Sequence, residues 1–179
     1  MTGAAERWTP QDMEREEGPT MENKGSWVVE GLVTGLIGYV TVVALFALAN
    51  LVSGEGAFHT PSLLGSALFY GLRDPADLIP GPGPIIAYNG VHILVSLLIG
   101  LGAAWMVFQT EKNRPLWYAV FFVFLAGFIY SVVVMGVFAA EIVDLVSWPM
   151  IVAANLAAGL TAGGYLWWRH SQLWRELKV

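Results

Sequence analysis

His92 has the most distinctive chemistry in this sequence, because it lies inside a long apolar run, Ile85 to Gln109. Tyr88 precedes it by one helical turn, and Asn89 follows that tyrosine along the chain. An imidazole inside a membrane can ligate haem or a chlorophyll-type pigment, hydrogen-bond a quinone carbonyl, or relay protons. His59 is expected on the same side of the membrane, so a His59/His92 pair could hold one haem near the surface. The candidate cofactor-binding residues are therefore His92, Tyr88 and His59.

The same histidine also has a purely structural interpretation, as a neutral side chain hydrogen-bonded to a neighbouring helix. Asn50, Tyr130 and Asn155 are its candidate partners. Polar side chains in membrane spans often serve packing, and two histidines without a wider motif are weak support for a haem. The sequence leaves both interpretations open, and the simpler expectation is that no cofactor is bound.

No pattern in the chain indicates a catalytic reaction. The absence of cysteine excludes thiolate nucleophiles, iron–sulfur ligation and cysteine-based zinc sites. There is no nucleophile elbow, zincin helix or phosphate-binding glycine loop. We therefore expect no catalytic residue, no metal site and no enzymatic activity. A few carboxylates could gather around a cation, but a solvated acidic rim explains them equally well: Glu55, Asp74, Asp77, Glu141 and Asp144.

The composition predicts an integral membrane protein. Of the 179 residues, 56% are hydrophobic and only 13% are charged, whereas soluble domains carry about 25% charged residues. The apolar residues form runs long enough to cross a bilayer. The predicted fold is an all-α, four-helix transmembrane bundle over 27–168, between a polar acidic tail (1–26) and a basic end (169–179). Its spans are expected at about 27–51, 85–109, 116–142 and 148–168.

The loop 53–84 is expected to contain a short outward-facing interfacial helix over 61–72, which is apolar but too short to span. Thr60 is the predicted N-cap and Pro61 the first helical residue. The proline- and glycine-rich segment 78–84 is predicted to return as a stiff, extended stretch without regular hydrogen-bonded structure.

The distribution of Lys and Arg predicts the orientation. Eight of the nine basic residues fall in the tail, the loop after the second span and the C-terminal end, and only Arg73 lies on the other side. By the positive-inside rule, both termini should be cytoplasmic, in a bacterial inner membrane. Glu30 is then expected to be a boundary carboxylate reaching the headgroups, with a proton relay as the alternative. His170 is expected to be a surface residue on the inner side.

Small residues predict close contacts between helices. Glycines 31, 35 and 38 share a face of the first span, and Gly100 lies in the second. Asn155, Gly159 and Gly163 recur every four residues in the fourth span. These faces offer more contact surface than one compact bundle requires, which favours binding to other membrane subunits.

The leading functional hypothesis is a non-catalytic, accessory subunit of a larger membrane complex, such as a respiratory or photosynthetic electron-transfer assembly. Its partners would be other subunits and the lipid bilayer, and the net charge of −5 without a basic patch argues against nucleic acid. The N-terminal tail is either a flexible acidic segment or a docking arm anchored by Trp8. The alternatives are a haem-, pigment- or quinone-binding redox protein using His92 and, more weakly, a small-solute transporter. Transport is less favoured because Glu30 is the single acidic residue within the body of a span.

Overall fold

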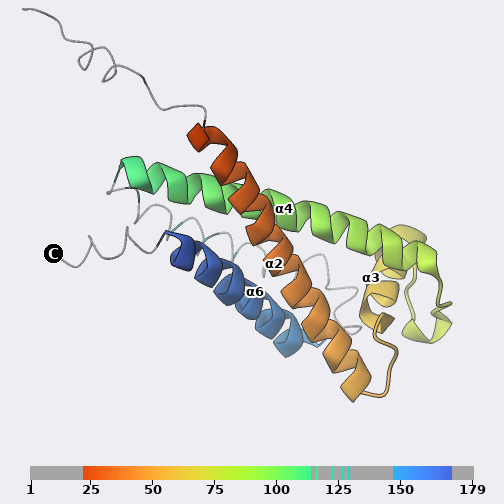
Figure 1. Cartoon of the computed structure of the whole chain (residues 1–179). Helices are drawn as coiled ribbons and strands as arrows, with labels where there is room; N and C mark the ends of the chain where they lie inside the picture. The colour runs from red at the N-terminus through yellow and green to blue at the C-terminus, as the bar shows by residue number, and fades with distance from the viewer. Residues whose placement is uncertain are drawn as a thin grey trace, which may run out of the picture.

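In the part of the chain that the computed structural model describes, every element is helical (Figure 1). The described residues are 22–113, 116, 122, 126, 129 and 147–170. The predicted third span and both chain ends therefore lie largely or wholly outside them. The elements are α2 (Glu22–Val52), α3 (His59–Tyr70), the 3-10 helix η1 (Pro75–Asp77), α4 (Pro82–Lys112) and α6 (Trp148–Arg169).

Three of these helices are long and apolar enough to cross a membrane. The apolar segments are Trp27–Val52, Pro82–Thr110 and Trp148–Arg169, with mean hydropathies of 2.3, 2.2 and 1.3. Their lengths of 26, 29 and 22 residues meet the requirement of about 20 residues for a hydrocarbon core of about 30 Å. The prediction of an all-helical chain with helices of membrane-spanning length is thus confirmed for the described residues. The three helices lie where the first, second and fourth spans are predicted.

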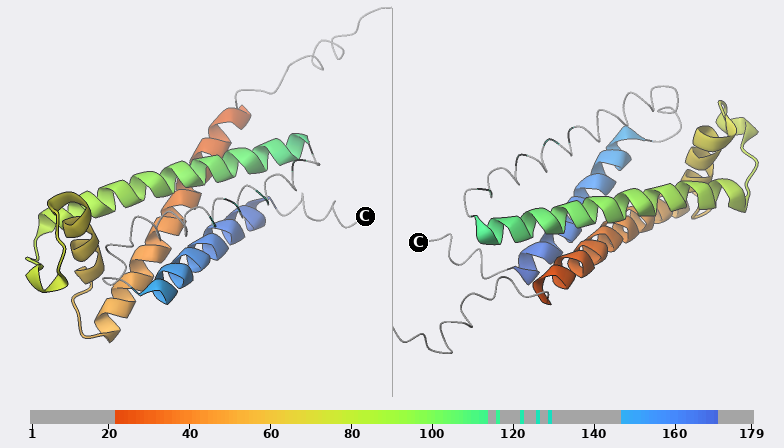
Figure 2. Two further views of the ribbon diagram at one scale, coloured as in Figure 1. Left: turned by 180° about the vertical axis from the view of Figure 1, so that it is seen from behind. Right: turned by 90° about the horizontal axis from the view of Figure 1, so that it is seen from above.

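Helix α2 contacts both other long helices, and α4 crosses it at a glycine contact (Figures 1 and 2). A Cβ atom added to Gly31 would lie 2.7 Å from the Cα of Leu101. One added to Gly100 would overlap the backbone of Gly31 and Gly35. The backbones meet because these three residues carry no side chain, as is common where membrane helices pack. The glycines predicted at 31, 35 and 100 therefore form the crossing.

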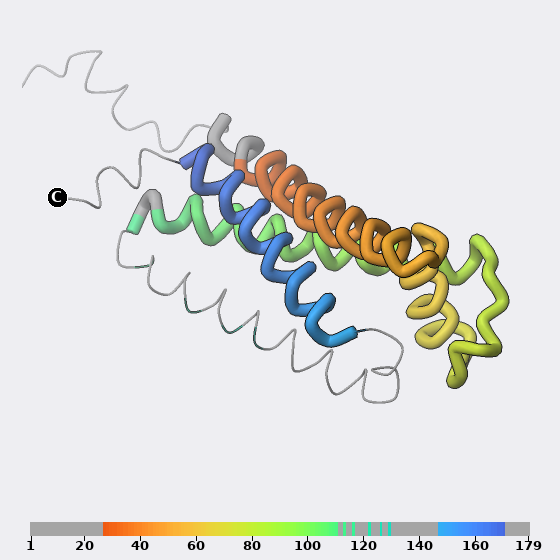
Figure 3. Tube along the Cα trace, turned by 90° about the horizontal axis from the view of Figure 1, so that it is seen from below, coloured from red at the N-terminus to blue at the C-terminus, as the bar shows by residue number. Residues whose placement is uncertain are grey.

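Helix α6 lies against α2 on another side, as the view from below shows (Figure 3). The hydroxyls of Thr41 and Thr161 lie 3.0 Å apart between the two helices. A small buried cluster of Ala103, Ala104 and Leu166 joins α4 to α6. Among the described residues, three of the six buried apolar residues are alanines, and many large apolar side chains are exposed, as expected of helices whose outer surfaces face lipid.

Helix α3 packs against the first turn of α4, and its N-terminus differs from the prediction. The helix begins at His59 with Phe58 as its N-cap, and no side chain caps it. Thr60 instead donates from its Oγ1 to Oδ1 of Asn50 at 2.7 Å. The predicted capping role of Thr60 is wrong because the helix has already begun at His59, and the Thr60 hydroxyl is buried against α2, where it bonds the side-chain oxygen of Asn50.

The proline-rich return also differs from the prediction, because it contributes the first turn of α4. This helix begins at Pro82, with Gly81 as its N-cap. The first four N–H groups of any helix have no partner within it, so the missing N–H groups of Pro82 and Pro84 cost nothing there. Earlier in the loop, Asp74 accepts a 2.8 Å hydrogen bond from the backbone of Ala76 and starts η1.

Candidate functional site

Two helices bring an aromatic and polar cluster together around His92. Tyr39 of α2 meets the His92 ring edge-on, with centroids 5.3 Å apart, and Tyr88 lies at 5.7 Å from the same ring. The Tyr39 hydroxyl donates to Oδ1 of Asn89 at 3.0 Å, and that amide donates in turn to the backbone oxygen of Ile85 at 2.9 Å. The predicted pair of Tyr88 and His92 is therefore adjacent, and Tyr39 completes the cluster from the neighbouring helix.

A small cavity lies beside this cluster, where α2, the start of α3 and α4 meet. Its volume is about 20 Å³, which is room for one water molecule. Ligand sites for small molecules measure about 300–1,000 Å³, so the cavity as shaped here accommodates neither a haem nor a quinone ring. The residues lining it include Phe46, Phe58, Thr60, Tyr88, Asn89 and His92.

The Nδ1 atom of His92 is buried and has no hydrogen-bond partner among the described residues. Of the partners expected from the sequence, Asn50 bonds Thr60 and the backbone of Ala57, and Asn155 bonds the backbone of Ile151. Tyr130 lies outside the described residues. A buried polar atom without a partner costs about 1–3 kcal/mol, so a water or another ligand that satisfied Nδ1 would be stabilised there.

His59 is not presented to this cavity. Its Nδ1 lies 3.1 Å from Oε2 of Glu55, one turn earlier, and the pair is partly exposed to solvent. The neighbouring residues Phe58 and Thr60 line the cavity, whereas His59 does not. The structure thus brings Tyr88 to His92 but does not bring His59 and His92 to a common opening.

A charged cluster at the other end of the bundle involves Glu30, expected at the membrane boundary, and His170, expected at the surface. Oε1 of Glu30 lies 2.9 Å from Nη2 of Arg169, and Oε2 lies 2.7 Å from Nε2 of His170. The Glu30 and His170 side chains are only 7% and 8% exposed. Phe108 of α4 meets the His170 ring edge-on at 5.3 Å. We call Glu30, Phe108, Arg169 and His170 the three-helix clamp, since they join α2, α4 and α6.

The clamp corrects two expectations from the sequence. Glu30 is not a boundary carboxylate reaching lipid headgroups, and His170 is not a surface residue, because each side chain is buried against the other. The physical reason is that a carboxylate near the start of one span is stabilised by basic groups at the same depth on a neighbouring helix. Among the described residues, no group of three or more carboxylate or imidazole side chains is placed to hold a metal ion.

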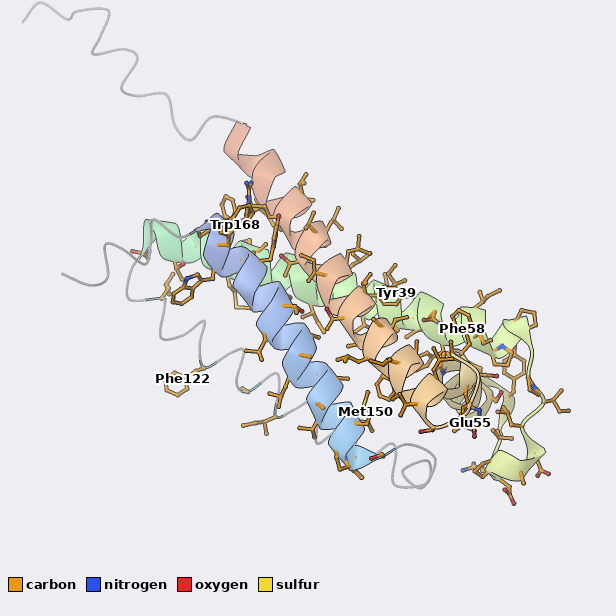
Figure 4. The ribbon with its side chains drawn as sticks, turned by 60° about the horizontal axis from the view of Figure 1, so that its bottom comes forward. Tyr39, Glu55, Phe58, Phe122, Met150 and Trp168 are labelled. Carbon is orange, nitrogen blue, oxygen red and sulfur yellow. The ribbon has the colours of Figure 1, made fainter. Side chains whose placement is uncertain are left out.

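Tyr39 and the three-helix clamp were not predicted from the sequence. Tyr39 carried no visible signal, because a lone tyrosine inside an apolar span is most simply a packing residue. The clamp could have been found from the sequence, because the predicted topology places the start of the first span and the end of the last span on the same side of the membrane. Figure 4 shows where the two clusters lie: Tyr39 is near the middle of α2, and Trp168, the residue before Arg169 of the clamp, is at the end of α6.

No family model matches this chain, and no curated protein or solved structure is found to be similar to it.

Proposed function

We propose that this chain is a non-catalytic, structural subunit of a larger membrane complex. The observation that carries the proposal is the way its intramembrane polar groups are used. Glu30 pairs with Arg169 and His170, Tyr39 bonds Asn89, and Thr41 meets Thr161, each pair bridging two helices. Such contacts fix the arrangement of helices and do not line a passage, which favours a structural role over transport.

The proposed architecture is a four-span bundle with both termini on the cytoplasmic side of an inner membrane. As the residue number rises along α2, the contacted residue number falls along both other helices. On α4, Gly31 meets Leu101 and Tyr39 meets Asn89. On α6, Glu30 meets Arg169 and Thr41 meets Thr161. Both helices are therefore antiparallel to α2 and parallel to each other. The chain leaves α4 on one side of the bundle and enters α6 on the other, so one further crossing between 113 and 147 would connect them. The excess of Lys and Arg on the side of the termini supports their cytoplasmic placement.

Partner subunits would bind through the helix surfaces that the described contacts leave open. Gly159 and Gly163 of α6 have no atom of another described residue within 4 Å of an added Cβ, in contrast to Gly31 and Gly35. Glycine allows a helix from another chain to approach closely, and the N-terminal tail offers a further contact. An electron-transfer assembly is the class of complex we favour.

The test is purification of the native protein from its own membranes in mild detergent, followed by mass spectrometry of every co-purifying chain. The expected result is one or more membrane subunits in stoichiometric amounts. The Gly159→Leu variant should lose those partners and remain folded, whereas Gly56→Leu, in the loop outside the three apolar segments, should retain them. A protein that purifies alone, without partners in either form, would contradict the proposal.

A redox, pigment or quinone site at His92 is the second candidate, and it is favoured by the buried, unpartnered Nδ1 atom. In this alternative the cavity of about 20 Å³ would have to open to admit the group. His92 would then bind the group and Tyr88 would orient it, while His59 would require a different conformation to contribute. The visible absorption spectrum of the same purified sample tests for a haem or pigment, and chromatography of its organic extract tests for a quinone. A visible band or a bound quinone that His92→Ala removes would support the second candidate, and a sample with neither would leave His92 as a packing residue.

A further inference from the structure

A depression of about 560 Å³ lies where α3, η1 and α4 meet, at the end of the bundle opposite the three-helix clamp. Helix α3 ends at Gly71, whose positive φ of 72° reverses the chain, and the amide of Leu72 closes the turn on the Ser66 oxygen at 3.1 Å. The chain then returns through η1 to Pro82. We call this hollow the outer depression; the side chains used below are Tyr70, Leu72, Arg73, Asp77 and Ile79, all of which line it.

The length of α4 places the outer depression at the depth of the lipid headgroups. The apolar segment Pro82–Thr110 has 29 residues, which corresponds to about 43 Å of helix. The hydrocarbon core is only about 30 Å thick, so the ends of this helix extend into the headgroup layers. Pro84, in its first turn, lines the depression. Tyr70 forms a wall over the same turn, with its hydroxyl 3.0 Å from the position of a Cβ on Gly83.

The outer depression combines one cation, one anion and apolar walls. The Arg73 guanidinium is suited to a phosphodiester, which it can bind through two parallel hydrogen bonds. The Asp77 carboxylate, in the same hollow, is suited to an ammonium group. Leu72 and Ile79 supply apolar surface, and Ile79 is 84% exposed, as expected for a side chain that meets lipid.

We propose that the outer depression binds the headgroup of a zwitterionic phospholipid with a primary ammonium, a phosphoethanolamine headgroup. Its phosphate would contact Arg73, its ammonium would contact Asp77, and its glycerol and upper acyl chains would lie along Ile79. The volume falls within the range of about 300–1,000 Å³ that small-molecule sites occupy. A net-anionic headgroup fits less well, because Asp77 repels it. This inference requires that the chain lies in a membrane and is independent of the accessory role.

The experiment measures lipid binding to the full-length protein in detergent micelles by native mass spectrometry. Short-chain phosphatidylethanolamine and phosphatidylglycerol are titrated separately, and inorganic phosphate is added as a competitor. We expect phosphatidylethanolamine to bind more tightly to the unmodified protein. Arg73→Gln should weaken that binding about tenfold, the effect of one lost charge-assisted contact. Asp77→Asn should abolish the preference between the two lipids. Glu55→Gln, which removes a partly exposed carboxylate that does not line the depression, should change neither affinity.

Several outcomes overturn the proposal. They are equal affinity for both lipids, unchanged binding by Arg73→Gln, an identical effect of Asp77→Asn and Glu55→Gln, and displacement of the lipid by phosphate at equal concentration. The last of these would indicate a site for small anions. Circular dichroism verifies the helix content of each variant. If Arg73→Gln does not fold, Arg73→Lys provides the test, because it keeps the charge but loses the paired hydrogen bonds and should weaken binding several-fold.

Discussion

Replacing Gly35 with alanine puts a methyl group where α2 and α4 are in backbone contact. The added Cβ would lie 2.5 Å from the Ser96 oxygen and 2.7 Å from the Cα of Leu97. Both neighbours are backbone atoms, which no rotamer change can remove. Helix α4 would have to move by about 1 Å to restore an ordinary contact of about 3.5 Å. Overpacking of this kind costs typically about 1–3 kcal/mol.

Gly38→Ala on the same helix is the matched control, because its Cβ would meet no atom of the described residues within 4 Å. Both substitutions change helix propensity by the same amount, about 1 kcal/mol in favour of alanine. This contribution cancels when the two variants are compared. The difference in their free energies of unfolding should therefore equal the overpacking cost of about 1–3 kcal/mol, with Gly35→Ala the less stable.

Thermal unfolding in detergent, followed by tryptophan fluorescence, measures this difference. For a chain of this size, 1 kcal/mol corresponds to about 2–4 °C, so Gly35→Ala should melt roughly 2–12 °C below Gly38→Ala. Gly100→Ala, on the other side of the same contact, should behave as Gly35→Ala does. If Gly35→Ala and Gly38→Ala melt together, α2 and α4 do not cross at Gly35 and the antiparallel pairing described above is wrong.

Substitutions at three further contacts test the polar interactions between helices. Glu30→Gln should lower the free energy of unfolding by about 1–3 kcal/mol in denaturant unfolding, because it removes a buried charge-assisted pair. Arg169→Gln should also destabilise the protein, because it takes one cationic partner away from a carboxylate that stays buried. Thr60→Val removes the hydroxyl that bonds Asn50, so it should lower the free energy of unfolding by about 1–2 kcal/mol and speed amide hydrogen exchange at the start of α3. Thr60→Ser keeps the hydroxyl and should keep the slow exchange. Tyr39→Phe should lower the free energy of unfolding by about 0.6 kcal/mol, the average for a hydrogen bond between membrane helices. An unchanged unfolding midpoint would show that the bond to Asn89 does not stabilise the protein.

The sequence was most informative where a physical requirement acts on a whole segment. A span needs about 20 apolar residues, so the three long helices could be located from composition alone. Small residues were equally informative at the α2–α4 crossing, because only glycine permits backbone contact at Gly31, Gly35 and Gly100. Both inferences depend on local composition and not on knowing which helices are neighbours.

Single side chains were less predictable, because their roles depend on neighbours that are distant in sequence. Thr60 has the residue type and position of an N-cap, yet its hydroxyl bonds Asn50 on another helix. Pro82 and Pro84 were interpreted as residues that break structure, although a helix start accepts prolines without loss. Only part of the cluster at His92 could be predicted. The contact of Tyr88 with His92 follows from their spacing of four residues on one helix, whereas the contact of Tyr39 depends on how α2 and α4 pack.

The three-helix clamp could have been predicted by considering charged residues of different spans in pairs. Glu30 lies three residues after Trp27, the start of the first span, and Arg169 is the last residue of the final one. The positive-inside rule places both positions on the same side of the membrane, and therefore at similar depth. A carboxylate inside a span is expensive unless it is paired, so Glu30 required a cationic partner from another helix. Taken one at a time, Glu30 was assigned to the membrane boundary and His170 to the inner surface; considered together with the topology, they predict the contacts of Glu30 with Arg169 and His170 that join α2 to α6.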